Sequence, residues 1–301
     1  MKKSPPVLPV GDFFVLLQSY MNGYTPDIPA IERPRLWRLA LQLEPGLLSA
    51  VIWSTVEDST LTHFTLPLDP TQPGHKSLEE AVYAAPVLLY DFGRVDIVVR
   101  TPQYVTSPAA LGDESAASIL DYLCLLPEQP EHECKTDTVE VCDTAIAWPI
   151  ATDTAHFLAR TFRNPRVMSH VSPLLRYFSC NSGTGNSGKL YAHFSECGGS
   201  RQLDIIATGT DGKPLLACTH SLAGDDDALY YILLALQTAG LDRISDEIQL
   251  CGHAAIRDAV MPRLRQYAAK VLPLIFPSAA YRNGKDALRA PFPLIILPLC
   301  E

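Results

Sequence analysis

The chain repeats one order of apolar and polar segments twice. Residues 36–68 contain three apolar runs separated by turn residues, which predicts three antiparallel strands. Residues 190–222 have the same pattern, with a Gly-Gly turn at 198–199 and an Asp-Gly turn at 211–212. In both halves the predicted order then continues as helix, strand, helix and strand. We therefore expect an α/β protein whose two halves share supersecondary structure but not residues.

The first half contains further segments with clear apolar periodicity. They predict, in order, a helix over 77–85, a buried strand over 94–100, a helix over 113–123, a polar loop over 127–137, a strand over 139–150, a helix over 152–161, and a strand and a short helix within 165–178. Ser172 is the expected N-cap of that short helix, because Pro173 suits its first position.

The second half continues from its three strands in a similar way. We expect a helix over 224–239, a strand over 247–252, a helix over 254–270 and a strand over 271–276. The last segment, residues 291–301, is strongly apolar and is expected to be buried.

These patterns divide the chain into four parts. Residues 1–34 are rich in proline and are expected to form a mobile arm. The first domain is expected over 35–180, a Gly/Ser/Asn-rich linker over 181–188, and the second domain over 189–301.

The formal net charge of −9 and the spread of basic residues exclude a nucleic-acid backbone or an anionic membrane as the main partner. No apolar run reaches the roughly 18 residues that a membrane helix needs. Prolines interrupt the apolar start of the chain, so we predict no signal peptide and a cytoplasmic location. The eight cysteines form no C-x-x-C pair, and we expect reduced thiols and no metal site.

Residues 183–189 match the spacing of the phosphate-binding P-loop, G-x-x-x-x-G-K. The next residue is Leu190 rather than the Ser or Thr that would hold magnesium, and the following residues alternate like a strand rather than a helix. We therefore interpret this stretch as a linker.

Two other groups of residues invite a chemical interpretation. His170, Ser172 and Asp204 have the side chains of a catalytic triad, but no G-x-S-x-G sequence surrounds Ser172. Three consecutive aspartates at 225–227 stand in the first turn of a predicted helix, where they stabilise the helix dipole without a metal. Neither group predicts a catalytic centre.

The chain resembles the bacterial family known as domain of unknown function 3822. The matching segments are PQYVTSPAAL at 102–111, SHVSPLLRYF at 169–178, DIIATGTDGKPLLACTHS at 204–221, DDDALYYILLALQTAGLD at 225–242 and the ending LPLCE. The resemblance implies a fold similar to the actin-like ATPases, in which two ribonuclease-H-like domains face each other across a nucleotide cleft.

In that superfamily the hairpin turn of each domain carries an Asp and a Gly near the phosphates. Here Glu44, Ser195 and Glu196 stand where Asp is expected, and Pro45 removes one N–H donor. His253 replaces the second glycine of the adenosine-contacting turn. The candidate cleft-lining residues that the resemblance implies are Glu44, Gly46, Ser195, Glu196, Gly198, Gly199, Gly252 and His253.

These substitutions predict a degenerate, non-catalytic member of the superfamily that acts through a protein partner or self-association. No cofactor is expected beyond weak binding of ATP and magnesium. Two alternatives remain open at this point. One is an ATPase or small-molecule kinase that uses Glu44 and Glu196 in place of the usual Asp residues, since carboxylates of either length bind magnesium. The other is a module whose cleft binds a small ligand near His253.

Overall fold

The computed structural model describes residues 31–111, 131–182, 185–197, 199–276 and 289–299, together with Ser118 and Ala287. The predicted helix over 113–123 and nearly all of the predicted N-terminal arm lie outside the described residues.

The first half forms a five-stranded sheet of order β3-β2-β1-β4-β8. Its strands are β1 (Trp37–Glu44), β2 (Leu47–Ser54), β3 (Thr62–Pro67), β4 (Arg94–Val99) and β8 (Arg166–Ser169). The first three are antiparallel, and β4 lies parallel to β1. The meander predicted from the sequence is confirmed, and Gly46, with φ of +76°, provides the positive φ needed in the turn from β1 to β2.

The second half forms a sheet with the same order, β11-β10-β9-β12-β13. Its strands are β9 (Lys189–Cys197), β10 (Ser200–Thr208), β11 (Pro214–Leu222), β12 (Glu247–Gly252) and β13 (Val271–Pro273). Again the first three strands are antiparallel, and β12 lies parallel to β9. The two sheets therefore establish two ribonuclease-H-like domains, as the sequence pattern and the resemblance predict.

A third sheet, of order β5-β7-β6, is inserted in the first domain. It contains β5 (Val105–Pro108), β6 (His132–Val139) and β7 (Thr144–Ala151). The polar loop predicted over 127–137 is wrong for residues 132–137, because β6 is partly buried along most of its length and so lacks the apolar alternation of a core strand. The single strand predicted over 139–150 is interrupted by the 3-10 turn η4 (Glu140–Cys142) and by Asp143 in the left-handed region.

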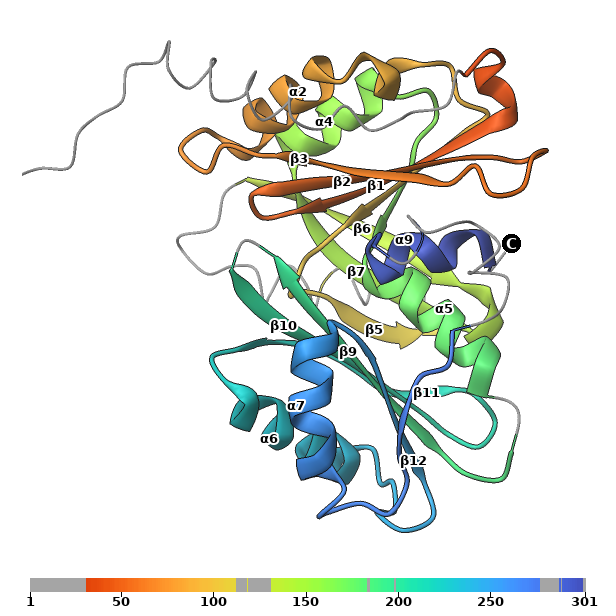
Figure 1. Ribbon diagram of the computed structural model, residues 1–301, viewed down its shortest axis with the longest axis vertical. Coiled ribbons are helices and arrows are strands. Elements are labelled where there is room, and N and C mark those ends of the chain that lie inside the picture. The colour runs from red at the N-terminus through yellow and green to blue at the C-terminus, as the bar shows by residue number, and fades with distance from the viewer. Residues whose placement is uncertain are drawn as a thin grey trace, which may run out of the picture.

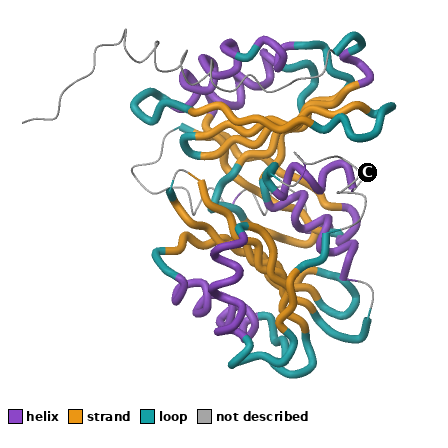
Figure 2. Tube along the Cα trace, viewed as in Figure 1, coloured by secondary structure: helices purple, strands orange, loops and turns teal. Residues whose placement is uncertain are grey.

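The helices divide the molecule into layers (Figure 1). The helices α2 (Gly74–Ala84) and α4 (Thr152–Thr161) cover the outer face of the first sheet, and α6 (Asp225–Thr238) and α7 (Ala254–Leu264) cover the outer face of the second. Between the two sheets lie α5 (Val171–Ser182) and α9 (Phe292–Ile296), as the tube in Figure 2 also shows.

Some helix ends differ from the prediction. Helix α7 ends at Leu264 instead of at residue 270, and Ser172 lies in the first turn of α5 rather than at its N-cap. Helix α5 continues to Ser182, so it includes the first two residues of the predicted linker. The remaining short 3-10 helices are η1 (Pro34–Leu36), η2 (Pro86–Leu89), η3 (Ala109–Leu111) and η6 (Leu297–Leu299). Within the described part of the chain, no helix combines the length and apolar character needed to span a bilayer.

The C-terminal segment returns to the first domain. Leu294 and Ile295 are buried in one cluster with Ala40, Val51 and Val98 of the first sheet. The burial predicted for this segment is therefore found for residues 292–297, but the contacts of Leu294 and Ile295 belong to the domain that begins the chain. The prediction placed this segment in a second domain of 189–301. An apolar run predicts that a segment is buried, but it does not predict which sheet the segment packs against.

We expect Leu294→Ala to lower the free energy of unfolding by about 2–5 kcal/mol, because it removes a fully buried side chain and leaves a cavity. Urea unfolding measures the change. Leu272→Ala is the matched control, since Leu272 is 44% exposed. Equal effects of the two substitutions would contradict the docking of the C-terminal segment on the first sheet.

Candidate functional site

Polar side chains from both domains meet between the two large sheets. Arg100 directly follows β4 and His170 directly follows β8, so both stand at the carboxyl edge of the first sheet. The second sheet contributes Asp204 from β10, with His193 of β9 and Thr219 of β11 directly opposite it in the neighbouring strands. Because paired residues of adjacent strands share a face, these three side chains lie side by side. We call these five residues the interdomain cluster.

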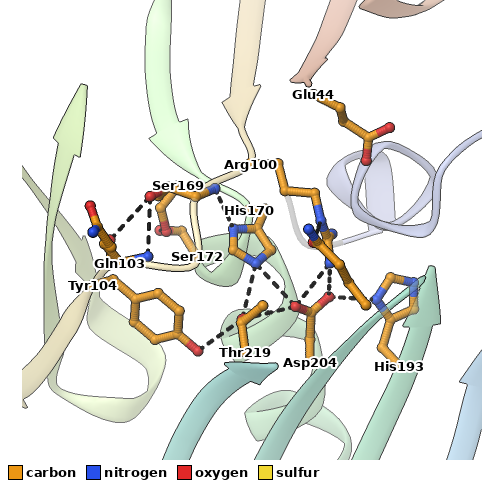
Figure 3. A network of polar contacts seen from close by, with 12 residues as sticks. Glu44, Arg100, Gln103, Tyr104, Ser169, His170, Ser172, His193, Asp204 and Thr219 are labelled. Carbon is orange, nitrogen blue, oxygen red and sulfur yellow. Dashed lines mark hydrogen bonds and ion pairs between the residues drawn. The ribbon is translucent and has the colours of Figure 1, made fainter. Parts of the chain in front are cut away.

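The carboxylate of Asp204 is the centre of the cluster (Figure 3). Arg100 Nη2 lies 3.1 and 3.0 Å from its two oxygens, and His193 Nδ1 lies 2.9 Å from Oδ2. His170 Nε2 lies 3.1 Å from Oδ1, and Thr219 Oγ1 donates to the same atom at 2.9 Å. The side chains of Arg100 and Asp204 are only 1% and 2% exposed. The cluster is therefore a desolvated ion pair whose carboxylate has donors on both oxygens.

Backbone contacts fix the orientation of His170. The N–H of Thr101 donates to His170 Nδ1 at 3.4 Å. Since Nδ1 accepts a hydrogen bond, the proton of a neutral His170 is assigned to Nε2, which then donates to Asp204. Tyr104 extends the cluster, with its hydroxyl 3.3 Å from Thr219 Oγ1.

Burial and charge act on the cluster in opposite directions. Burial favours the neutral form of Asp204, but the Arg100 guanidinium and the two histidines outweigh it and hold the pKa of Asp204 well below its usual range. Burial lowers the pKa of His170, although the Asp204 carboxylate opposes that shift. At neutral pH the cluster is therefore an ionised Asp204–Arg100 pair with a neutral His170.

The two candidate residues of the first hairpin lie next to a cavity of about 510 Å³. Glu44 is buried, and its Oε1 accepts a hydrogen bond of 2.6 Å from Gln42 Nε2. Gly46 lies in the turn that follows. Other lining residues include Arg100 and Thr154, and all of them fall within 43–154, so the wall of this cavity is built by the first domain.

The candidate residues of the second hairpin are arranged differently. Glu196 is exposed, and its Oε2 lies 3.3 Å from His253 Nε2 at the N-cap position of α7. Ser195 is half-buried, and its Oγ has no hydrogen-bond partner among the described residues. Gly199 lies in the turn with φ of +79°, and Gly198 lies outside the described residues. The structure thus brings Glu196 and His253 together.

Gly252 has a purely steric explanation. Its φ is +89°, and a Cβ at this position would lie 1.9 Å from the carbonyl oxygen of Phe194 in the neighbouring strand β9. His253 N donates to that same oxygen at 2.8 Å, so the backbone passes unusually close to β9 here. Glycine is required at residue 252 by this close approach, whether or not a ligand binds nearby.

Neither the P-loop-like stretch nor the triad-like group of residues adopts the geometry of its motif in the structure. Lys189, the last residue of the P-loop-like stretch, opens strand β9 instead of a helix, and its Nζ donates to the carbonyl of Asn181. Of the triad candidates, His170 does contact Asp204, but the hydroxyl of Ser172 donates to Asp137. The interdomain cluster as a whole was not predicted, because its members are distributed over residues 100–219 with no local signature.

Comparisons with known proteins show which family and which solved structures the chain resembles. A family model described as "Protein of unknown function (DUF3822)" matches residues 31–271. A crystal structure from Bacteroides thetaiotaomicron, described as a protein with actin-like ATPase fold and unknown function, superposes with a TM-score of 0.74 at 22% identity, covering 88% of this chain and 98% of that one. No curated protein matches the sequence.

More distant structures also superpose. One is a PilM–PilN type IV pilus biogenesis complex, with a TM-score of 0.45, 13% identity, and 87% and 94% coverage of this chain and that one. Another is the ethanolamine utilization protein EutJ from Carboxydothermus hydrogenoformans, with a TM-score of 0.43, 8% identity, and 94% and 98% coverage. Likenesses of this size do not bear on function.

We expect Gly252→Ala to lower the free energy of unfolding by at least about 3 kcal/mol, because the new Cβ overlaps the backbone of β9 and the left-handed φ is strained. Gly240→Ala is the matched control. Gly240 also has a positive φ, +68°, but a Cβ added there would meet nothing within 4 Å. The control should cost about 1–2 kcal/mol. A loss at residue 252 no larger than at 240 contradicts the steric explanation.

The pH dependence of stability follows from His170. Its pKa is lower in the folded protein than the usual 6.5, so the unfolded chain binds a proton first as the pH falls. The free energy of unfolding should therefore decrease as the pH falls below about 6.5. His170→Asn should make stability less dependent on pH between about 7 and 5, measured by urea unfolding at each pH. An unchanged slope would contradict this assignment, because it would show that the pKa of His170 is the same in the folded and unfolded protein.

Proposed function

The chain belongs to the family described as "Protein of unknown function (DUF3822)", and we propose that it is a non-catalytic member of the actin-like fold that acts through protein contacts. The observation that carries this proposal is the interdomain cluster, in which the buried carboxylate between the domains is occupied by the protein's own donors. The alternative of an ATPase or small-molecule kinase requires carboxylates that are free to position magnesium and water.

Asp204 offers little to a metal ion. Its Oδ1 accepts from Arg100, His170 and Thr219, and its Oδ2 accepts from Arg100 and His193. A carboxylate that binds magnesium must direct oxygen lone pairs at the ion, and here those directions are taken by N–H and O–H groups. If a magnesium ion displaced these donors from Asp204, Arg100 would stay buried without its counter-ion, which is strongly unfavourable.

The two glutamates of the hairpins are also engaged. Glu44 is buried and bonded to Gln42, whereas Glu196 is exposed and paired with His253. The first hairpin turn contains Pro45, which has no N–H to offer a phosphate. These contacts support a scaffold that has kept the geometry of its superfamily while its polar groups satisfy one another.

The cluster also favours one arrangement of the domains. Opening the space between them would separate Arg100 from Asp204 and expose a buried ion pair that is coupled to both sheets. Actin-like enzymes of the type considered in the alternative rely on domain closure around the ligand. A locked pair of domains supports a role as a rigid binding body.

Exposed aromatic side chains support the contact role. Tyr83 and Tyr90 of the first domain and Tyr230 and Tyr267 of the second are each about half exposed. Tyrosine is enriched at protein interfaces because it combines a large apolar ring with a hydroxyl group.

Titration calorimetry with ATP and magnesium, together with a phosphate-release assay, tests the proposal. We expect no saturable heat in the micromolar range and no turnover above the buffer blank. Micromolar binding with turnover, lost in the double variant Glu44→Gln/Glu196→Gln, would establish the ATPase alternative instead.

Light scattering over a range of protein concentrations distinguishes self-association from binding to a different protein. A mass that rises above the 33.0 kDa of one chain assigns the contact to a second copy, and a constant mass assigns it to a different protein.

A further inference from the structure

A second cavity, of about 360 Å³, is lined by residues of the first domain and Leu297 and by none of the five residues of the interdomain cluster. Its wall includes residues of β8 and β6 and the first turns of α5. Both strands are the outer strands of their sheets, so the cavity lies where two unpaired strand edges face each other. The cavity runs along β8, from Arg94 and Arg166 at the amino edge of the first sheet to Ser172 in the first turn of α5.

Three arginines line this cavity, namely Arg94, Arg166 and Arg176. Arg94 Nε lies 2.8 Å from the buried carboxylate of Asp96, and Arg166 Nη1 lies 3.7 Å from the same carboxylate. Arg176, on α5, has no ion pair or hydrogen bond with any residue that the structure describes. Two guanidinium groups therefore share one carboxylate and a third has none, in a chain whose net charge is −9.

One acid, Asp137, also lines the cavity, and one of its carboxylate oxygens accepts two hydrogen bonds from the protein. Asp137 Oδ2 accepts the backbone N–H of Ser169 at 2.7 Å and the hydroxyl of Ser172. Burial raises the pKa of Asp137, which reduces its negative charge relative to an exposed aspartate. The charged residues that line the cavity are the three arginines and Asp137, so positive charge predominates in its wall even with Asp137 ionised.

We propose that this cavity binds a small organic oxyanion, a phosphate or carboxylate group carried by a small molecule. Guanidinium groups match such oxyanions by paired, charge-assisted hydrogen bonds. The volume falls at the lower end of the range for small-molecule sites. Apolar wall residues such as Val139 and Leu297 would contact the uncharged part of the ligand. Arg176 is the principal anion-binding residue, because it has no competing carboxylate.

The test is titration calorimetry at low ionic strength with inorganic phosphate, glycerol 3-phosphate and succinate as probes. We expect saturable binding of at least one probe, weakened at least about tenfold by Arg176→Gln. Saturation by the two phosphates alone assigns the site to phosphate groups, and saturation by succinate alone assigns it to carboxylates. Arg166→Gln changes a second arginine of the same cavity and should also weaken the binding of that probe.

Arg160→Gln is the matched control. It removes the same charge from an exposed arginine of α4 that pairs with Glu79 and does not line the cavity. Its affinity should stay within about twofold of the parent protein, and thermal melting should show that all three variants are folded. The proposal is overturned if no probe saturates, or if Arg160→Gln weakens binding as much as Arg176→Gln does.

Discussion

The arrangement of the two domains depends on the buried ion pair between Arg100 and Asp204. Taking both charges out of water is costly, and the hydrogen bonds to both oxygens of the Asp204 carboxylate offset part of that cost. Truncating one partner of such a pair typically costs about 3–5 kcal/mol, since the other charge stays buried alone. The pair joins the end of β4 in one sheet to the middle of β10 in the other, and it acts together with apolar contacts such as the stacked rings of Phe178 and Tyr191 between the domains.

The same contact links architecture to chemistry. In a cleft built for a nucleotide, carboxylates between the domains keep free oxygens for a metal ion and water. Here His170 and His193 contact the carboxylate of Asp204, and the neutral His170 can donate without adding a second buried charge. The carboxylate of Asp204 could either stabilise the contact between the domains or bind a cofactor. In this structure its oxygens accept hydrogen bonds from the protein.

The elements that local sequence determines could be predicted, and the contacts between distant residues could not. The turn at Gly46 and the hairpins of the second sheet were recognised because turn residues separate short apolar runs. Strand β6 was missed because both of its faces are partly buried, so its polar residues resemble a loop. Asp204 lies 104 residues from Arg100, and a single aspartate in an apolar strand gives no indication of its partner. Gly252 was associated with a ligand although a backbone contact requires it.

The two ends of strand β4 differ in how their charges are paired and exposed. It begins with Arg94 and is followed by Arg100, so a guanidinium group stands at each edge of the first sheet. At the carboxyl edge the charge is neutralised by Asp204 of the other domain and is inaccessible. At the amino edge Arg94 and Arg166 both contact Asp96, and the side chain of Arg166 is 53% exposed. Because an anion is attracted to positive charge that water can reach, the exposed Arg166 gives this side of the sheet a property of an anion-binding site that the buried Arg100 lacks.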